Sequence, residues 1–510
     1  MGITQVPPVP VPSAKGEIVV GTATGPTKLT ASTSANLNIL TDPTTASGLK
    51  FGITGLTAVH QLAPGHTNPT AITGYSYTSP NLTYNAAGHP FLVNHYVVTN
   101  GIIQNSTTGT PGRASTVVAV SGSSTFTFNI STTAPGSWVS GGLATFMVGG
   151  NPSIAKYING TYFIGTNAGS YWYSTDAVNW TYGQVPNQAN GIVGIDHDGT
   201  TYAIAIAGTT NGGGIWTSTT LTSNSWVQRS TFGGFYIGDI KWCAGSVNRW
   251  VAVGSSTSVY SGGGVRIETA SSGAVTWTSQ TINGTATNAA KAVAFDGSNT
   301  VVVNNENEGL IIGSSGATAW TGYASNVTTN PSSNIANQAY LRNGISPAAS
   351  IYNPVTGRWL SYNLSTPGLG NVVSTTNALS LPWNKSVAQN FWSANYYAVQ
   401  DNNSGHNTRN PIIYDSASQT FKTYSLEGGN FQVFSYSATP TTINTFQEVY
   451  PLTGIQTSVN MPSINYRTSN AMASPTTGTY TAVYGNGKWV VLSQMMDSGN
   501  FGNYVISVLS

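Results

Sequence analysis

Charged residues are scarce in this chain of 510 residues, of which they make up 6%, against about 25% in an ordinary soluble domain. The 17 basic and 15 acidic residues leave a net charge of only +2. No basic stripe marks a nucleic-acid partner. Because Glu, Lys and Arg are also strong helix formers, their scarcity argues against helices.

Cysteine and targeting signals are nearly absent as well. The single Cys243 cannot form an intrachain disulfide, and its apolar surroundings predict a small buried residue rather than a nucleophile. The first residues lack the regions of a signal peptide, Gly2 lacks the Ser or Thr of a myristoylation motif, and no stretch is apolar enough to span a bilayer. We expect assembly in a cytoplasm without membrane insertion, and no cofactor.

Glycine and aromatic residues are plentiful. The chain contains 58 glycines, 13 Trp and 26 Tyr, and aromatic residues reach 11%. Aromatic and β-branched residues favour strands and can bury a core. The composition therefore predicts an all-β protein.

A two-part pattern recurs along residues 138–510, about once every 40–60 residues. Tight turns between apolar runs alternate with aromatic residues flanked by small polar residues. The turns are Asn159-Gly160, Asp198-Gly199, Asn248-Arg249, Asp296-Gly297, Thr356-Gly357, Ala394-Asn395 and Asn486-Gly487, and the aromatic residues are Trp138, Trp180, Trp226, Trp277, Trp320, Trp383 and Phe421. Several short strands per unit at this period predict a C-terminal β-propeller of about seven blades.

The two series are offset at their ends. The aromatic series begins at Trp138, before any turn, and the turn series ends at Asn486-Gly487, with no aromatic marker after it. We therefore predict that the last blade lacks an outer strand and that an N-terminal strand near Trp138 supplies it. Such pairing closes the ring and removes free sheet edges.

The segment Ser174-x-Asp176-x-x-x-Trp180 resembles the Asp-box of sialidase-like propellers, although Ala177 stands where glycine is common. The expected role of Ser174, Asp176 and Trp180 is structural. Short polar side chains bind the backbone amides of the turn, and the aromatic ring packs between sheets.

Residues 1–55 differ from the rest. Residues 6–12 are proline-rich and predict an extended arm. Residues 15–22, 39–42 and 48–51 resemble the N-terminal segment of many tailed-bacteriophage tail-fibre and other virion structural proteins. The resemblance implies a virion-attachment arm that binds other virion proteins.

The remaining chain divides in two. Residues 56–135 predict a small antiparallel β domain, because apolar and polar residues alternate along residues 124–130. Residues 136–510 form the predicted propeller. His89 in the small domain, and Asp196 to Gly199 in the propeller, are interpreted as core or turn residues rather than metal ligands.

Three irregular stretches interrupt the repeat, at residues 321–346, 387–412 and 427–477. Loops on a rigid scaffold commonly carry binding sites, and aromatic, amide and charged groups suit sugars. The candidate binding residues are Trp392, Asp401, His406, Arg409, Tyr450, Tyr466 and Arg467. We expect no catalytic and no metal-binding residues.

These features predict a tail-fibre or tail-associated structural protein of a bacteriophage virion. It is expected to form homo-oligomers, to be assembled in the host cytoplasm, and to attach to a host surface polysaccharide. One alternative is a purely structural connector or decoration protein of the virion. The other is a glycan hydrolase of the sialidase-like propeller type, which is not favoured because the eight arginines are scattered along the chain.

Overall fold

The computed structural model describes residues 58–64, 70–105, 112–146, 152–185, 191–208, 213–256, 264–284, 290–305, 309–324, 347–363, 372–375, 384–386, 412–427, 430–444, 447–460, 480–495 and 503–510, less residues 92, 94, 113, 131–133, 314 and 451, together with four short strands between residues 18 and 53. The described chain is β-structure with three 3-10 turns and no α-helix. These turns are η1 (Ser223–Ser225), η2 (Phe232–Gly234) and η3 (Ser315–Ala317). The prediction of an all-β protein is confirmed.

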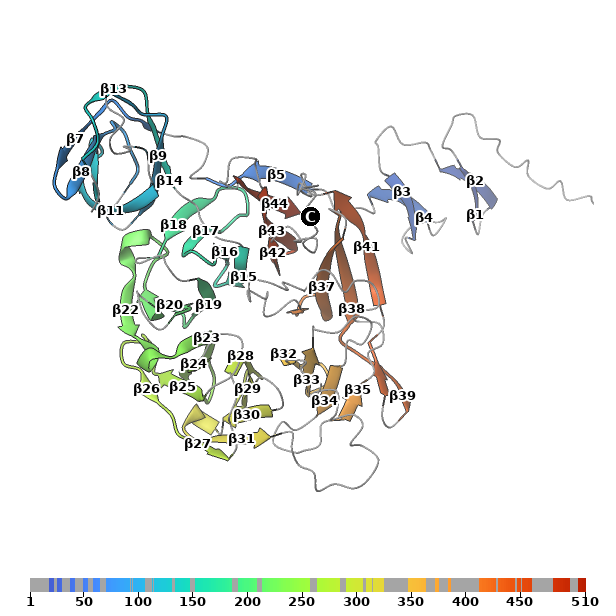
Figure 1. The fold of residues 1–510 in the computed structure, drawn as a ribbon. Coiled ribbons are helices and arrows are strands. Elements are labelled where there is room, and N and C mark those ends of the chain that lie inside the picture. Colours follow the sequence, from blue (N-terminus) through green and yellow to red (C-terminus); the bar gives the residue numbers. More distant parts are fainter. Residues whose placement is uncertain are drawn as a thin grey trace, which may run out of the picture.

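Seven sheets of four or five strands lie around a common centre, and a small β domain stands beside them (Figure 1). This arrangement resembles a β-propeller. Sheet 1 contains β15 (Pro152–Ile158), β16 (Thr161–Thr166), β17 (Ser170–Ser174) and β18 (Thr181–Gln184), and sheet 2 contains β19 (Ile192–His197), β20 (Tyr202–Ile206), β21 (Gly214–Ser218) and β22 (Val227–Ser230). Sheet 3 contains β23 (Tyr236–Cys243), β24 (Arg249–Ser255), β25 (Val265–Ala270) and β26 (Thr278–Ser279). Sheet 4 contains β28 (Ala290–Phe295), β29 (Val301–Asn305), β30 (Gly309–Gly313), β31 (Trp320–Ala324) and β27 (Ile282–Gly284), which pairs in parallel with β31.

The other three sheets follow the same plan. Sheet 5 contains β32 (Pro347–Asn353), β33 (Arg358–Asn363), β34 (Val372–Thr375) and β35 (Asn384–Ser386). Sheet 6 contains β36 (Ile413–Asp415), β37 (Thr420–Glu427), β38 (Asn430–Ser437) and β41 (Leu452–Asn460). Sheet 7 contains β42 (Tyr480–Gly485), β43 (Lys488–Met495), β44 (Asn503–Leu509) and β5 (Ala58–Leu62). A separate hairpin, β39 (Thr441–Asn444) with β40 (Gln447–Val449), lies between β38 and β41 in sequence.

The predicted turns join the first strand of a sheet to its second at six of seven positions. At three of them an asparagine takes a left-handed φ: Asn159 at 47°, Asn248 at 44° and Asn486 at 45°. Asparagine tolerates this conformation better than most residues. The seventh turn, Ala394-Asn395, lies outside the described residues. Sheet 6 instead makes its first hairpin at residues 416–419.

The aromatic markers precede or begin the fourth strand of sheets 1 to 4, at Trp180, Trp226, Trp277 and Trp320. Trp277 and Trp320 each donate their indole N–H to the carbonyl three residues earlier, at 3.0 and 3.1 Å. Phe421 does not follow this pattern. It lies in β37, the second strand of sheet 6, paired with Tyr414.

The strand that completes sheet 7 is β5, not the strand near Trp138. In β5, Leu62 pairs with Val505 of β44, and the N–H of Ala63 donates to the carbonyl of Tyr504 at 2.8 Å. Trp138 begins β13 (Trp138–Ser140), which pairs with β10 (Ile103–Gln104). The prediction for Trp138 was wrong because its indole N–H donates to the carbonyl of Gly141, at 3.1 Å, so it serves a local turn of the small domain.

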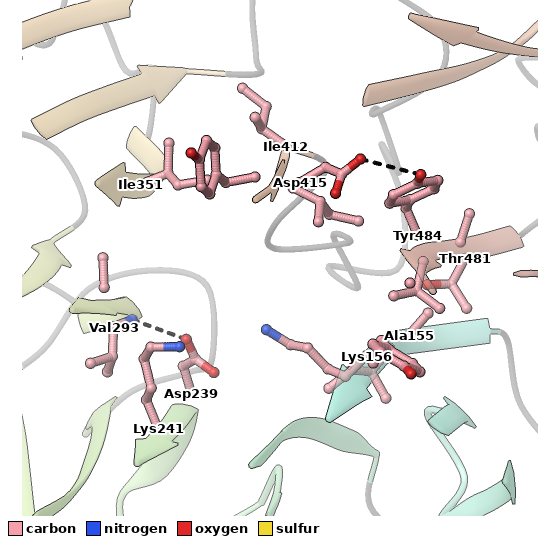
Figure 2. Close-up of a pocket in the computed structure, with 18 of the residues that line it drawn as sticks. Ala155, Lys156, Asp239, Lys241, Val293, Ile351, Ile412, Asp415, Thr481 and Tyr484 are labelled. Atoms are coloured by element: carbon pink, nitrogen blue, oxygen red, sulfur yellow. Dashed lines mark hydrogen bonds between the residues drawn. The ribbon is translucent and has the colours of Figure 1, made fainter. Parts of the chain in front are cut away.

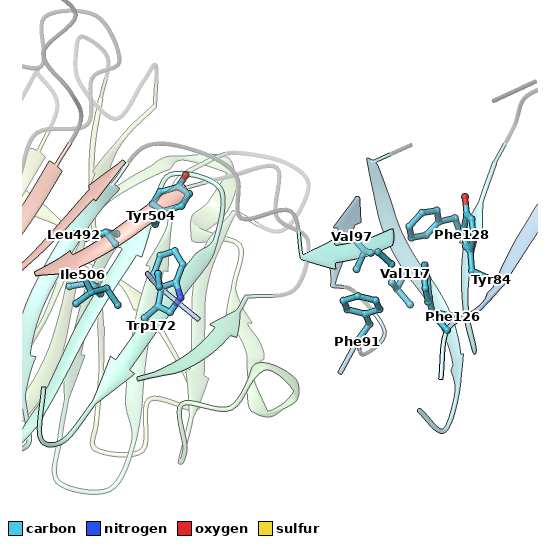
Figure 3. Close-up of a cluster of buried hydrophobic side chains, with 14 of the residues drawn as sticks. Tyr84, Phe91, Val97, Val117, Phe126, Phe128, Trp172, Leu492, Tyr504 and Ile506 are labelled. Atoms are coloured by element: carbon cyan, nitrogen blue, oxygen red, sulfur yellow. The ribbon is translucent and has the colours of Figure 1, made fainter. Parts of the chain in front are cut away.

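Sheets 1 and 7 pack against each other although they lie far apart in sequence. The hydroxyl of Tyr162 in β16 donates to the carbonyl of Gly485 in β42. The rings of Trp172 in β17 and Tyr504 in β44 lie 5.4 Å apart, and Figure 3 shows them together in one apolar cluster. The first and last sheets are therefore neighbours.

The small domain is inserted between β5 and β15. Its other strands are β6 (Thr70–Ala71), β7 (Gly74–Thr78), β8 (Asn81–Asn85), β9 (Tyr96–Asn100), β11 (Ala114–Ser121), β12 (Thr125–Asn129) and β14 (Leu143–Phe146). They form a seven-stranded sheet in the order β6-β14-β9-β11-β12-β8-β7. Tyr84 and Phe126 stack at 5.0 Å in its buried core (Figure 3). Strand pairing places this domain at residues 70–146 rather than at the predicted 56–135.

Two hairpins precede β5. Strand β1 (Ile18–Thr22) pairs with β2 (Gly25–Leu29), and β3 (Leu37–Thr41) pairs with β4 (Leu49–Ile53). These strands pair with no other strand in the described part of the chain. The proline-rich residues 6–12 lie outside that part.

We predict that deleting residues 1–62 lowers the melting temperature by at least about 5 °C, because loss of β5 leaves the edge of β44 unpaired and uncovers apolar side chains of sheet 7. Deleting residues 1–55, which leaves β5 in place, is the matched control and should leave the melting temperature unchanged. Thermal unfolding followed by circular dichroism measures both. Equal melting temperatures for the two truncations would contradict the role of β5.

Stability should also depend on His95, which is buried beside Tyr182 of β18 at a ring distance of 6.5 Å. Burial lowers the pKa of His95 from 6.5 to about 4. Below pH 6.5 the unfolded chain gains a proton that the folded chain does not, so stability falls between pH 6.5 and 4, on the order of 3 kcal/mol in total. His95→Phe should reduce this fall, measured by urea unfolding at pH 7.5 and 4.5. An unchanged pH dependence would refute this assignment.

Candidate functional site

A cavity of about 460 Å³ lies where the first strands of the seven sheets meet. Each of β15, β19, β23, β28, β32, β36 and β42 contributes to its wall. Much of the wall is aliphatic, including Val193, Val293, Ile351 and Ile412. Small-molecule sites commonly have this size and a few convergent polar groups.

Five of the seven first strands have a β-bulge near their beginning. The register shifts between Pro152 and Ile154 in β15 and between Ile192 and Gly194 in β19, and likewise in β23, β28 and β32. A bulge bends the strand and re-aims its side chains. In β15 and β19 the bulged residues, Ser153 and Val193, both line the cavity.

Asp239 is the most buried charged group of the cavity wall, with 4% of its surface exposed. One carboxylate oxygen accepts the N–H of Ile240 at 2.8 Å, and the other accepts the N–H of Val293 in the next sheet at 2.9 Å. Backbone donors of this kind stabilise a buried carboxylate. Asp239 therefore joins sheets 3 and 4 beside the cavity (Figure 2).

Lys241 follows two residues later on β23. Its Nζ lies 3.9 Å from a carboxylate oxygen of Asp196, in sheet 2. That oxygen already accepts the N–H of Trp242 at 3.0 Å. Burial alone would lower the pKa of Lys241, but the carboxylates of Asp196 and Asp239 outweigh it and the pKa is raised. Lys241 is therefore an ammonium group at neutral pH.

On the opposite side, Asp415 of β36 accepts the hydroxyl of Tyr484 in β42 at 3.3 Å (Figure 2). The hydroxyl of Ser418 and the N–H of Ala417 also donate to it, at 2.6 and 3.1 Å. Burial raises the pKa of Asp415, but these donors and Lys422 outweigh it and the pKa is lowered. The pKa of Tyr484 is raised, by burial and by Asp415, so its hydroxyl stays protonated.

Lys156 and Thr481 are two further polar residues of the wall. The ammonium group of Lys156, from β15, extends into the cavity (Figure 2). Thr481 of β42 is fully buried, and its Oγ1 has no hydrogen-bond partner among the described residues. The wall thus combines lysines, hydroxyl groups and hydrogen-bonded carboxylates. The sequence did not lead us to predict these charged wall residues. The signal that could have identified them was a charged residue inside an apolar strand such as β23, which is unusual in a chain with 6% charged residues.

Of the predicted binding residues, the structure describes only Tyr450. It is 1% exposed, and its ring packs edge-on against Phe421 at 5.8 Å. A side chain so buried belongs to the core between sheets 5 and 6 and does not face solvent. The others lie outside the described residues: Trp392, Asp401, His406, Arg409, Tyr466 and Arg467.

Ser174 and Asp176 hold the turn between β17 and β18. Asp176 accepts the N–H groups of Val178 and Asn179 at 2.7 and 2.8 Å, and the Ser174 hydroxyl oxygen accepts the N–H of Ala177 at 2.9 Å. Ala177 takes a left-handed φ of 62°, a conformation that glycine adopts more readily than other residues. The hydrogen bonds from the Asn179 and Val178 backbone, with the side chains of Asn179 and Ser174, lower the pKa of Asp176. Trp180 packs on the neighbouring apolar cluster.

Asp198 occupies the first hairpin turn of sheet 2 and also binds sheet 3. One oxygen accepts the N–H groups of Thr200 and Thr201 at 3.0 and 2.7 Å. The other accepts the indole N–H of Trp250 at 3.1 Å and the N–H of Gly273 at 2.6 Å. Burial raises the pKa of Asp198, but these donors outweigh it and the pKa is lowered.

No family model matches the chain, and a search of curated proteins finds no match. Among solved structures, the chain is similar to the β-propeller domain of Cps50 (Swd1) from Myceliophteria thermophila. That similarity has a TM-score of 0.40 and 6% sequence identity, and it covers 71% of this chain and 96% of the other. In the described part of the chain, no helix is long and apolar enough to cross a membrane, and no group of three or more His, Cys, Asp or Glu residues could hold a metal ion.

We predict that Asp198→Ala destabilises the protein by about 2 kcal/mol more than Asp296→Ala does. Asp296 occupies the matching turn of sheet 4 and accepts the N–H groups of Ser298, Asn299 and Thr300, but only Asp198 also bonds a neighbouring sheet. Urea unfolding at pH 7 measures the difference. It should shrink below about pH 4, where the Asp198 carboxylate loses its charge in the unfolded chain first. Equal losses would show that the contacts with sheet 3 add nothing.

Proposed function

We propose that this protein is a structural component of a bacteriophage virion, in a tail fibre or associated with the tail. Residues 1–55 anchor it to other virion proteins, and the C-terminal region presents a surface for host glycans. The observation that carries the proposal is the pairing of the N-terminal strands. The hairpins β1–β2 and β3–β4 pair with no other described strand.

Two-stranded hairpins are only marginally stable alone in water, and their outer edges present unpaired N–H and C=O groups. Another protein can supply the missing strands by edge-to-edge pairing. The segments that resemble virion proteins, residues 15–22, 39–42 and 48–51, overlap β1, β3 and β4. Strand pairing and sequence resemblance thus support the same attachment role for this arm.

We infer that the seven sheets form a closed ring of seven blades. Three observations support this: seven sheets whose first strands share one cavity, the contact between sheets 1 and 7, and the outer position of β5 in sheet 7. Pairing of β44 with β5 covers a sheet edge that would otherwise be exposed. A rigid ring suits a protein that projects binding loops from a particle surface.

Attachment through the arm predicts that a chain lacking residues 1–55 folds but is absent from purified particles. Particles should be assembled in host cells that supply either the full chain or the truncated one. Mass spectrometry of the particles measures incorporation, and the melting temperature of the free protein controls for folding. Normal incorporation of the truncated chain would exclude the arm as the anchor.

A matched experiment separates a receptor role from a purely structural one. Particles that carry the chain without residues 387–411, which include four of the candidate binding residues, should adsorb poorly to host cells although incorporation is normal. Unchanged adsorption would favour the connector or decoration role.

A further inference from the structure

Four tyrosines line the central cavity from the same position in four different sheets. Each is the penultimate residue of the first strand of its sheet, and each is half-buried. They are Tyr157 in β15, Tyr352 in β32, Tyr414 in β36 and Tyr484 in β42 (Figure 2 labels Tyr484). Because these first strands meet at the cavity, phenol rings from four sheets converge on one space.

A buried aromatic ring of the second strand holds each of these tyrosines in place. In every case the two residues are directly opposite each other in the strand pairing. The ring centroids lie 4.6 Å apart for Tyr157 and Tyr162, 5.3 Å for Tyr352 and Trp359, 5.6 Å for Tyr414 and Phe421, and 5.4 Å for Tyr484 and Trp489. A ring fixed in this way loses little conformational freedom when a ligand packs on its exposed side.

The packing of these rings does not require their hydroxyl groups. In sheet 4, Phe295 lines the cavity from the end of the first strand, β28, with no hydroxyl group. The hydroxyls of Tyr157, Tyr352 and Tyr414 form no hydrogen bond with any residue that the structure describes. A phenol hydroxyl both donates and accepts hydrogen bonds. The cavity wall therefore presents unused hydrogen-bonding groups beside apolar ring surface.

The charged groups of the wall are already engaged within the protein. The ammonium group of Lys241 lies 3.9 Å from a carboxylate oxygen of Asp196. Both carboxylate oxygens of Asp239 accept backbone N–H groups, and Lys156 has a partner in the chain. An ionic ligand would have to compete with these contacts and lose its own hydration. A neutral ligand that carries hydroxyl groups suits the wall better.

We propose that the cavity binds a neutral sugar, with the C–H groups of its ring packed on the tyrosine rings and its hydroxyl groups hydrogen-bonded to the phenols of Tyr157, Tyr352 and Tyr414. The faces of aromatic rings are negative and attract the weakly positive C–H groups of a sugar. The volume of about 460 Å³ lies within the range of small-molecule sites. The proposal rests on cavity residues alone and does not depend on the virion role.

Saturation-transfer NMR on the full-length protein tests the proposal. The probes are the neutral sugars glucose, galactose, mannose and N-acetylglucosamine, with glucuronate and glucosamine as charged counterparts. We expect at least one neutral sugar to bind with a Kd below about 10 mM, and both charged compounds to bind at least about threefold more weakly than the best neutral sugar. No binding of any of the four neutral sugars, or tighter binding of a charged compound, overturns the proposal.

Alanine variants locate the site. Tyr352→Ala and Tyr414→Ala should each weaken sugar binding at least about fivefold, because they remove the ring on which the sugar packs. Tyr236→Ala is the matched control, because Tyr236 is also half-buried in a first strand, β23, but does not line the cavity. Circular dichroism checks that each variant is folded. Sugar binding that is as tight in both cavity variants as in the wild type would place the ligand elsewhere.

Phenylalanine variants test the hydroxyl contacts and serve if an alanine variant fails to fold. Tyr352→Phe and Tyr414→Phe keep the ring and its packing, so the melting temperature of the free protein should not change. Each should weaken sugar binding about threefold through the loss of one hydrogen bond. Unchanged sugar affinity in both variants would refute the proposed hydroxyl contacts.

Discussion

Hydrogen bonds from side chains of one sheet to the backbone of the next join sheets 1 to 4 at their first strands. The Ser153 hydroxyl donates to the carbonyl of Ile192 at 2.9 Å, and Asp196 and Asp239 accept N–H groups of the sheets that follow them. A four-stranded sheet alone leaves apolar faces in water, and packing against its neighbours buries them. Apolar packing supplies the stabilisation, while these directional bonds determine how the first strands meet. The position and shape of the central cavity depend on both.

Several of the few carboxylates in the chain stabilise turns and strand contacts. Asp176, Asp198 and Asp296 bind backbone N–H groups of turns, and Asp239 binds two strands. Cys243 is buried, and burial is the main cause of the raised pKa of its thiol, which agrees with a packing role.

Local features of the fold could be predicted from the sequence, because short-range interactions determine them. Asn159-Gly160 and Asn486-Gly487 form tight turns since both residues accept left-handed φ values. The turn at Ser174 and Asp176 is likewise held by hydrogen bonds within a few residues. The outer strand of sheet 7 could not be assigned in this way. Trp138 carries the local marker, whereas β5 pairs with β44 across more than 400 residues without any marker of its own.

The sequence by itself determined the all-β class, the repeat, the turns and the scarcity of charge, because composition and two-residue periodicity express local preferences. Only the tertiary structure decided that β5 completes sheet 7, that Tyr450 is a core residue, and that Lys156, Lys241 and Thr481 share one cavity. Lys156, Lys241 and Thr481 come from three different sheets. The physical reason is that convergence at a centre depends on how sheets pack on one another, and no local pattern in the chain records that packing.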